Sequence, residues 1–366
     1  MAYTFITFGC WNNRNYKTGE QPMDAVLEKV KGEINNGNPE INRIIVSGDN
    51  YYPEKIKIEK DEKIKNVYIK NLKDGIQKLK DAAGDTPVSM VMGNHDLETN
   101  NSITEFKAES ENQEYVKKGN CSILQEEIAS KDLIDYLIFG EIETEITDVA
   151  LLMIDTTIYA EEVDENNYLP CYKEWFEKNG MTSEEITVKK IQDMQSKFVT
   201  EKIKDKQKII LIGHHPFFYK NKNNILIDNN IAGHLIEILK DKTIYYICAD
   251  RHYYQYATIE IEGITIHQYI VGTGGAELDS LPNDSTVTDF GVTFSVVEKN
   301  QEKDQMKDYG FLKVLLQKDK EPSFEFKNVN SSSAVSSSSG GKKSRKRRNS
   351  KLRKKRRKQS KKRYRY

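Results

Sequence analysis

The stretch Ile45-Val46-Ser47-Gly48-Asp49-Asn50-Tyr51-Tyr52 is a short apolar run that stops at a glycine and is followed at once by an aspartate. This pattern is typical of a buried strand whose carboxyl end opens into a loop, which is where open α/β sheets place their functional groups. Three other apolar runs, at 91–96, 210–216 and 246–252, also end in Asp, Asn or His. One Gly-Asp pair carries little weight, but four such strand ends predict a shared site.

Strand and helix patterns alternate around this stretch. Residues 3–8 and 41–48 have strand character, and residues 23–34 between them have the apolar spacing of an amphipathic helix. A second helix pattern at 67–79 leads into a strand at 87–93. This alternation predicts βαβ units, and therefore an α/β fold.

The rest of the chain, from residue 97 onward, continues the alternation. Residues 97–148 are polar and predict a surface excursion with a helix near 123–137, and residues 160–186 predict a loop that either packs over the site or is a plain surface insertion. Helices are expected at 188–203 and 231–239. The strands expected are 148–155, 208–213 and 243–249, followed by 265–271, 292–297, 311–316 and 324–326, which we expect to close a second sheet.

Charge is distributed unevenly along the 366 residues, although the net charge is zero. Residues 342–366 hold 17 of the 56 Lys+Arg and no Asp or Glu, which leaves 39 Lys+Arg against 56 Asp+Glu, a net charge of −17, in residues 1–341. Hydrophobic residues make up 37% of the chain, enough for a sizeable core. The composition predicts one folded domain over 1–328, a Ser/Gly linker over 329–341 and a disordered basic tail over 342–366.

The four cysteines, Cys10, Cys121, Cys171 and Cys248, follow no regular spacing, and we interpret them as reduced thiols. The N-terminus has no signal-peptide pattern, and no run reaches the 18 apolar residues of a membrane span. We therefore expect a soluble, intracellular protein without a membrane partner.

The residues at the four strand ends suggest metal chemistry. Carboxylate, amide oxygen and imidazole suit divalent or trivalent first-row metals, and Asp49 could bridge two ions about 3.5–4 Å apart in a phosphate-hydrolysing site. His95 follows the candidate ligand Asn94, so it would be free to stabilise the transition state or to protonate the leaving oxygen. A lone Asp or His at a strand end usually has a structural role, but the set together predicts a metal site.

Three segments resemble motifs of the calcineurin-like metallophosphoesterases: Gly48-Asp49-Asn50-Tyr51-Tyr52, Gly93-Asn94-His95-Asp96 and Gly213-His214-His215-Pro216. Tyr52 also resembles the metal-binding tyrosine of purple acid phosphatases, and Gly9-Cys10-Trp11-Asn12 stands where those enzymes have a Gly-Asp-Trp-Gly loop. The resemblance implies a four-layered α/β/β/α sandwich. It also implies two metal ions at the strand ends, drawn from Fe, Zn and Mn.

The resemblance implies a role for each matching residue. The implied roles are Asp49 as the bridging ligand, Tyr52 and His252 on the first metal, Asn94 and His214 on the second metal, and His95 as the general acid. Two positions depart from the family pattern, because Cys10 replaces an aspartate of the first metal and Asp250 replaces a histidine of the second. Both can still coordinate, a thiolate favouring softer ions and a carboxylate harder ones. The alternative is that the site has decayed.

Several neighbouring residues have supporting roles in this hypothesis. His215 and Asp96 are expected to orient ligands, although His215 could simply pack beside Pro216. Asn12 or Asn13 could supply an oxygen in place of Cys10, although turn formation is their more common role.

The basic tail has two interpretations. Its runs of charge, Lys354, Lys355, Arg356, Arg357 and Lys358 among them, fit nuclear localisation or binding to a nucleic-acid backbone. Alternatively, the tail keeps the protein soluble or meets its own acidic body.

Two classes of function follow from the sequence. The first is a metal-dependent phosphoric ester hydrolase, a phosphomonoesterase like the purple acid phosphatases, or a nuclease or phosphodiesterase tethered to nucleic acid by the tail. The second is a non-catalytic binding protein on the same scaffold.

Overall fold

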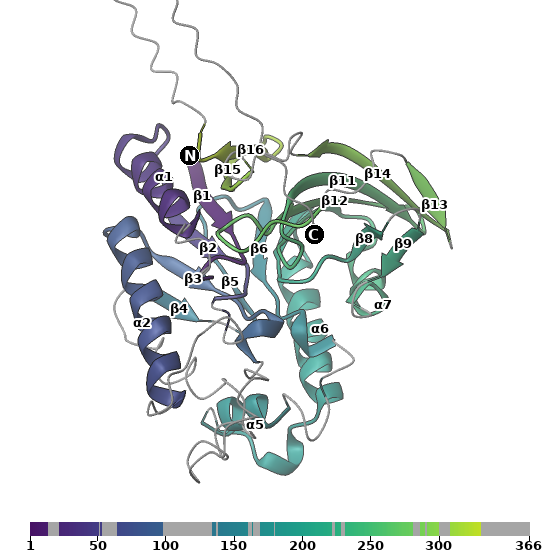
Figure 1. Cartoon of the computed structure of the whole chain (residues 1–366). Helices are drawn as coiled ribbons and strands as arrows, with labels where there is room; N and C mark the ends of the chain where they lie inside the picture. The colour runs from purple at the N-terminus through teal and green to yellow at the C-terminus, as the bar shows by residue number, and fades with distance from the viewer. Residues whose placement is uncertain are drawn as a thin grey trace, which may run out of the picture. The chain divides into compact units, whose positions relative to one another are not determined.

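The first sheet of the computed structural model contains the strands predicted at 3–8, 41–48 and 87–93 (Figure 1). β1 to β4 run parallel to one another, and β15 and β16 are antiparallel to their neighbours. Its strands, in spatial order, are β16 (Ser323–Asn328), β15 (Gly310–Gln317), β1 (Ala2–Phe8), β2 (Arg43–Val46), β3 (Val88–Met90) and β4 (Ile134–Tyr136).

The second sheet has a parallel centre, formed by β6, β7, β10 and β12, and antiparallel strands at both edges. Its strands, in spatial order, are β13 (Val287–Asp289), β14 (Val292–Lys299), β11 (Tyr254–Ile261), β12 (Ile264–Val271), β10 (Thr243–Cys248), β7 (Lys208–Ile212), β6 (Val149–Met153) and β5 (Gly140–Glu141). A separate hairpin pairs β8 (Phe218–Asn221) with β9 (Asn224–Ile227).

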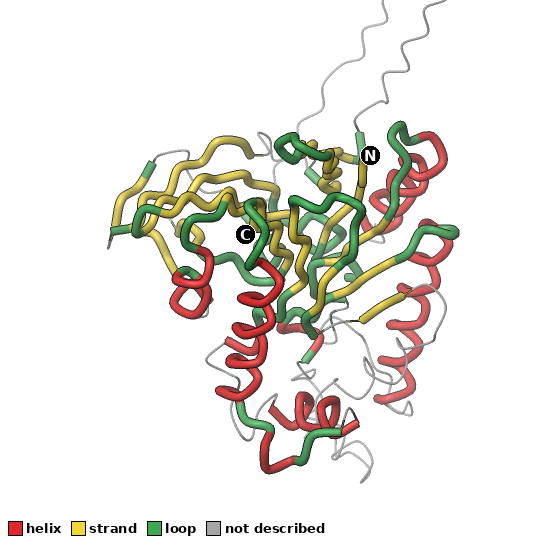
Figure 2. Tube along the Cα trace, turned by 180° about the vertical axis from the view of Figure 1, so that it is seen from behind, coloured by secondary structure: helices red, strands yellow, loops and turns green. Residues whose placement is uncertain are grey.

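The helices lie on the outer faces of the two sheets (Figures 1 and 2). The α-helices are α1 (Pro22–Asn36), α2 (Ile64–Ala83), α5 (Leu169–Lys178), α6 (Val188–Ile203) and α7 (Ile231–Leu235). Short 3-10 helices are η2 (Asn94–Asp96), η4 (Thr157–Tyr159), η5 (Ser183–Glu185) and η6 (Glu237–Leu239).

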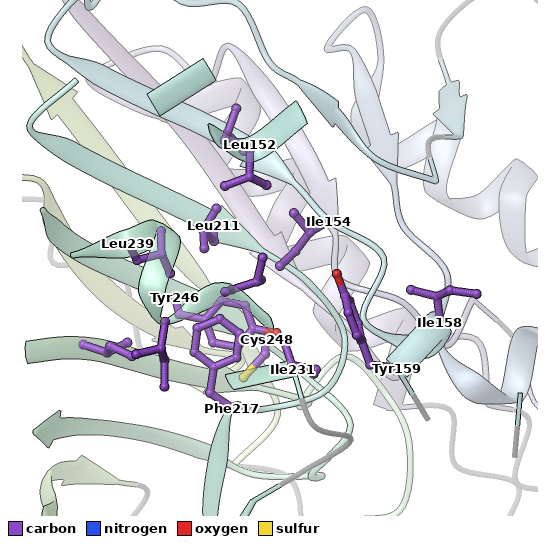
Figure 3. Packing of buried hydrophobic residues seen from close by; sticks show 14 of the residues in the cluster. Leu152, Ile154, Ile158, Tyr159, Leu211, Phe217, Ile231, Leu239, Tyr246 and Cys248 are labelled. Atoms are coloured by element: carbon purple, nitrogen blue, oxygen red, sulfur yellow. The ribbon is translucent and has the colours of Figure 1, made fainter. Parts of the chain in front are cut away.

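Three separate hydrophobic clusters show how the layers pack. One joins α1 and α2 to the first sheet, one fills the space between the two sheets, and one joins the second sheet to α5, α6 and α7. Figure 3 shows part of the last cluster, where Leu152, Leu211 and Tyr246 contribute from three adjacent strands. The layers are therefore α/β/β/α, as the resemblance implied.

The strand sequences explain why both faces of each sheet are covered. In β2, Ile44 and Val46 point into the cluster with the helices, whereas Ile45 points into the cluster between the sheets. Ile210 and Leu211 of β7 divide in the same way. Side chains alternate along a strand, so an uninterrupted apolar strand buries side chains on both faces of its sheet.

One prediction about the late strands is wrong. Segments 311–316 and 324–326 do not close the second sheet, because they form β15 and β16 of the first sheet, and β15 pairs with β1. Segments 265–271 and 292–297 do lie in the second sheet. Alternation of apolar residues shows which faces of a strand are buried, but not which strand lies beside it.

Two segments between the halves also differ from expectation. The end of the helix expected near 123–137 is instead β4, and residues 123–133 lie outside the described part of the chain. The loop expected over 160–186 contains α5, whose Tyr172 and Phe176 are buried against the second sheet. Apolar residues with helical spacing inside a polar stretch account for this helix.

Cys171 forms a disulfide bond, so the interpretation of all cysteines as reduced thiols is wrong for this residue. Cys10 and Cys248 are not part of a disulfide bond.

The structure describes residues 1–13, 22–50, 52, 64–97, 134–136, 138–159, 163, 169–178, 180–221, 224–227, 231–280, 286–289, 291–299 and 308–330. The described elements belong to one compact unit, Met1–Ser331, and residues 342–366 are not among the described residues. Among these residues, no helix has both the length and the apolar character that crossing a membrane requires.

Candidate metal centre

The carboxyl ends of five strands meet at one place, three from the first sheet (β1, β2, β3) and two from the second (β7, β10). Backbone hydrogen bonds tie the ends together. The Cys10 amide donates to Gly48 O at 3.1 Å, and the Ala249 amide donates to His214 O at 2.8 Å. The loops after these strands carry the predicted ligands Cys10, Asp49, Asn94, His214 and Asp250.

A glycine stands before each of the first four of these ligands, and its missing side chain lets the loops approach one another. A Cβ at Gly48, where φ is +86°, would lie 2.5 Å from His214 Nδ1. A Cβ at Gly93 would lie 2.3 Å from Asp49 Oδ1. Because no Cβ tolerates such distances, the Gly-ligand pairs in the sequence are a requirement of the packing.

Three of the predicted ligands have left-handed backbone conformations, with φ of 52° at Cys10, 52° at Asp49 and 58° at Asp250. This conformation costs about 1–2 kcal/mol for a residue with a Cβ, and it persists where the surrounding structure enforces it. Strain of this kind is concentrated at functional sites. Both residues that depart from the family pattern, Cys10 and Asp250, have this conformation.

One set of donors surrounds the imidazole of His214. Its Nε2 lies 3.2 Å from Asn94 Oδ1, 3.2 Å from Asp49 Oδ1 and 3.9 Å from Asp250 Oδ1. The other oxygen of Asp250 is 3.0 Å from Arg251 Nε, and the Arg251 guanidinium lies 3.9 Å above the ring of Tyr219. Three oxygens thus converge on one nitrogen. Asp250, the most distant of the three oxygen donors, is paired with Arg251.

A second set of donors lies on the other side of Asp49. Its Oδ2 is 3.1 Å from Tyr52 Oη and 3.6 Å from Cys10 Sγ, and Tyr52 Oη is 3.3 Å from His252 Nε2. Cys10, Asp49 and His252 form one candidate metal group by their donor atoms. The two carboxylate oxygens of Asp49 therefore belong to different donor sets.

Backbone carbonyls fix the ring orientation of both candidate histidine ligands. His214 Nδ1 lies 2.8 Å from Ser47 O, and His252 Nδ1 lies 2.7 Å from Glu277 O. A carbonyl only accepts, so each Nδ1 carries the hydrogen and each Nε2 lone pair faces the site. This arrangement is typical of histidine ligands in metalloproteins. Neither Ser47 nor Glu277 was predicted, because backbone atoms leave no signal in residue type.

Burial and charge set the pKa values at the site. Burial alone would raise the pKa of Asp49, but His214, His95 and His252 outweigh burial and lower it. Burial, and then the charge of Asp49, raise the pKa values of Cys10 and Tyr52 well above their usual ranges. A bound cation reverses this balance for a thiol or phenol ligand, so metal binding there would release protons.

The donor spacing fits metal ions. Ligands about 2.1 Å from one ion lie roughly 3.0–3.4 Å apart, and sulfur, at about 2.3 Å, lies farther from its neighbours. The nitrogen and oxygen pairs other than that with Asp250 are 3.1–3.3 Å apart, and the Cys10 sulfur pair is at 3.6 Å. Carboxylate, amide, imidazole, phenol and thiol donors at this spacing suit divalent first-row metals.

His95 and Asp96 follow Asn94 in the same 3-10 helix but point to different partners. The His95 amide donates to Asp49 Oδ1 at 3.2 Å, and its half-buried ring lies 4.6 Å from the ring of Tyr52. Asp96 is fully buried and accepts from the Asn50 amide at 2.8 Å and the Gly93 amide at 2.9 Å. Burial, then the charge of Asp49, raise the pKa of Asp96 to about 7. Asp96 thus links the loop after β2 to the loop after β3.

His215 lies beside His214, with ring centroids 4.8 Å apart, and burial, then His214, lower its pKa to about 3. Its Nδ1 is 3.0 Å from the hydroxyl of Thr156, which follows β6 and was not predicted as part of the site. The signal was available, because the apolar run at 148–155 ends in Asp155 and Thr156 as the other runs end in polar residues.

Asn12 does not replace Cys10 as a ligand. Its side chain lies against α2, where a Cβ at Gly75 would come within 2.1 Å of Asn12 Nδ2. The Asn13 amide donates to Trp11 O at 2.8 Å, as in a tight turn. The five tail residues 354–358 lie outside the described part of the chain.

Comparisons with solved structures give the same fold. The purple acid phosphatase PPD1 from yellow lupin (Lupinus luteus) seeds is similar with a TM-score of 0.57 and 11% identity, over 90% of this chain and 52% of that chain. This chain thus spans about half the length of the lupin enzyme. GAP50, the anchor in the inner membrane complex of Plasmodium, is similar with a TM-score of 0.50 and 15% identity, over 91% and 87% of the two chains. At these identities the likeness shows the fold alone.

No curated protein matches the sequence. The family model of the calcineurin-like phosphoesterases matches residues 8–254, a range that includes the ends of β1, β2, β3, β7 and β10. The protein belongs to the calcineurin-like phosphoesterase family.

Proposed function

We propose that the protein is a metal-dependent phosphoric ester hydrolase, most simply a phosphomonoesterase with a dinuclear centre. The observation that carries the proposal is the position of Asp49. Its Oδ1 faces His214, whose Nε2 also contacts Asn94, and its Oδ2 faces Tyr52 and Cys10. A carboxylate between two donor sets is the arrangement that a bridging ligand needs.

The residues of the chain divide the chemistry between them. Bound ions, from Fe, Zn and Mn, would polarise the phosphoryl group and lower the pKa of the attacking water. Tyr52, Cys10 and His252 would hold one ion, and Asn94, His214 and Asp250 the other. The reactants would thus be oriented by donors at the ends of rigid strands.

His95 is proposed as the general acid. Its backbone is anchored to Asp49 and its ring packs against Tyr52, so the imidazole is held beside both donor sets without belonging to either. A histidine in this position can protonate the leaving oxygen near neutral pH.

The test is metal content, measured together with hydrolysis of an aryl phosphate by the purified protein. We expect two ions per chain, with turnover that a chelator abolishes and added metal restores. Asp49→Asn should lose bound metal and turnover, because the bridging carboxylate charge is gone. Asp24→Asn, on the surface of α1, is the matched control and should behave as the unmodified protein. Turnover that survives complete metal removal would contradict the proposal.

A second candidate is a non-catalytic protein that uses this fold for binding. Cys10 and Asp250 depart from the family pattern, and GAP50, described as an anchor in Plasmodium, shares the fold. This candidate predicts bound metal without turnover of any phosphomonoester or phosphodiester.

The basic tail favours a variant of the first candidate, a nuclease or phosphodiesterase tethered to nucleic acid. Its 17 Lys+Arg over 25 residues suit a phosphate backbone, and they also suit nuclear import. Faster hydrolysis of a diester or an oligonucleotide than of an aryl monoester would support this variant.

A further inference from the structure

Thr156 occupies a turn that joins β6 to the metal centre. Its hydroxyl oxygen lies 3.0 Å from the backbone N of His214, 2.9 Å from the backbone N of His215 and 3.0 Å from His215 Nδ1. Three nitrogen atoms of the β7 loop thus surround one oxygen, which is fully buried.

The number of hydrogen atoms decides the direction of these three bonds. A threonine hydroxyl has one hydrogen and two lone pairs. Backbone amides only donate, so the amides of His214 and His215 occupy both lone pairs. The single hydrogen of Thr156 must then point at His215 Nδ1. That nitrogen is an acceptor, and the hydrogen of the neutral imidazole is on Nε2.

The position of Thr156 is fixed from the helix layer. The side-chain amide of Gln195 on α6 pairs with the backbone of Asp155, accepting from its N at 2.8 Å and donating to its O at 3.0 Å. The Thr157 amide donates to Asp155 Oδ1 at 2.8 Å. Both neighbours of Thr156 are therefore held, and its hydroxyl has little freedom to turn away.

His215 consequently has the opposite tautomer to the candidate ligands His214 and His252. In those residues Nδ1 carries the hydrogen and Nε2 offers a lone pair, as described above. His215 also lies in a group with His214 and Asp250 whose donor atoms are within 4.8 Å of one another, which residue type alone would suggest is a metal site. An Nε2 that carries hydrogen has no lone pair for a metal.

We propose that Thr156 is a positioning residue that fixes His215 as the Nε2–H tautomer, so that His215 supplies a hydrogen-bond donor to an oxyanion rather than a lone pair to a metal. The oxyanion is the Asp250 carboxylate or a phosphoryl oxygen of a bound phosphate. The second source rests on the proposed function, whereas the tautomer does not.

The tautomer is tested by nitrogen NMR of protein labelled with ¹⁵N in its six histidines, without metal and without substrate. The His215 signals are assigned by their loss in His215→Gln. We expect a pyridine-like Nδ1 and a pyrrole-like Nε2 in the unmodified protein and in Thr156→Ser, which keeps the hydroxyl. Thr156→Val, which lacks the hydroxyl, should show a mixture of tautomers. A pyrrole-like Nδ1 in the unmodified protein overturns the proposal, whether or not Thr156→Val folds.

The role is tested with Zn²⁺ and inorganic phosphate as probes. Zn²⁺ should shift the Nε2 signals of His214 and His252 and leave Nε2 of His215 pyrrole-like, and a coordination shift at His215 overturns the proposal. His215→Met should weaken phosphate binding to the Zn²⁺-loaded protein about tenfold if the oxyanion is phosphate, because one hydrogen bond to a charged group is lost. If the oxyanion is Asp250, the same variant should weaken Zn²⁺ binding instead.

His215→Gln, which keeps a donor, should restore most of either loss. Zn²⁺ and phosphate affinities that are unchanged in His215→Met overturn the role. A protein that keeps the tautomer and binds phosphate but does not hydrolyse esters would refute only the proposed function.

Discussion

The two donor sets at the strand ends differ residue by residue in chemical hardness. The set around His214 contributes oxygens from Asp49, Asn94 and Asp250, whereas the other set contains the sulfur of Cys10. Thiolates favour softer ions such as zinc, and carboxylates favour harder ions. Cys10 thus shifts the preference of its metal position toward softer ions, whereas Asp250 shifts the preference of the other position toward harder ions.

His214→Ala should lower both bound metal and turnover, because it removes the nitrogen on which Asp49, Asn94 and Asp250 converge. We expect the affinity of that position to fall at least about tenfold. Metal content after dialysis against a fixed free-metal concentration measures this. His234→Ala, on the exposed face of α7, is the matched control. Unchanged metal stoichiometry in His214→Ala would refute the assignment.

Cys10 should bind metal as a thiolate. Protein loaded with Co²⁺ should then show a sulfur-to-metal charge-transfer band that Cys10→Ser abolishes. Cys248→Ser should keep the band, because Cys248 Sγ lies 3.6 Å from Tyr269 O and belongs to neither donor set.

The double variant Cys10→Asp, Asp250→His tests the same point in reverse. If Cys10 and Asp250 are working ligands, restoring the family residues should change the metal preference and lower turnover with the native ion. Higher turnover in the double variant would show that the site had decayed.

At the scale of elements, the loops after the strands are packed so closely that only glycine fits between them. Gly93→Ala should therefore displace Asp49, whose Oδ1 would lie 2.3 Å from the new Cβ. We expect a loss of about 1–3 kcal/mol in the free energy of unfolding, as in other overpacked cores, together with weaker metal binding.

Gly32→Ala is the control for this substitution. It lies in α1, and apart from the adjoining backbone of that helix no atom is within 4 Å of the new Cβ, so the substitution should raise the free energy of unfolding by about 0.5–1 kcal/mol. Urea denaturation of both variants measures the two effects. Equal stability and metal affinity in the two variants would contradict the close packing of the loops.

Asp155 predicts a pH dependence of stability. Burial raises its pKa from 3.8 to about 6, although a hydrogen bond from Tyr172 opposes the shift. Between these values the folded protein keeps the proton that the unfolded chain has lost, so stability falls as pH rises through this window. Two pKa units correspond to about 3 kcal/mol.

Asp155→Asn should remove that contribution, so the difference in unfolding free energy between variant and unmodified protein should shift in favour of the variant from pH 4 to pH 7. Asp205→Asn, at an exposed position after α6, serves as the control and should show a constant difference. A constant difference in Asp155→Asn as well would contradict the raised pKa.

The sequence predicted α1, α2 and α6, most strands and the ligand-bearing strand ends, because helical spacing and an apolar run followed by Gly and a polar residue are local patterns. It did not predict α5, which lies where a loop was expected. It did not predict β11 or the partner of β15, because pairing is decided by edges that are distant in the chain. Ser47 O, Glu277 O and Arg251 were missed for a related reason, since a carbonyl and an ion pair depend on geometry rather than on residue type.

At the scale of the whole molecule, charge separates residues 1–341, with a net charge of −17, from residues 342–366, with a net charge of +17. Removing 342–366 should abolish salt-dependent binding to DNA or RNA and leave hydrolysis of an aryl phosphate unchanged, because nucleic-acid binding depends on released counterions.

Replacing Lys354, Lys355, Arg356, Arg357 and Lys358 by glutamine should reduce the slope of log affinity against log salt by up to about 4.5 on duplex DNA. Fluorescence anisotropy over a salt series measures both tail variants. Equal binding by the truncated protein at low salt would show that the tail is not the anchor.

The glycines before the ligands and the left-handed residues beside them have a consequence for how such a protein changes over time. The backbone conformation and the close packing at the glycines set the shape of each loop, so one donor side chain can replace another without a change in the loop. Cys10 and Asp250 have φ values of 52° and 58°, so this backbone conformation accommodates a thiol at one position and a carboxylate at the other. The metal preference of this centre could therefore be changed by substituting one ligand side chain at a time, whereas a methyl group added at Gly48 or Gly93 would displace the ligands themselves.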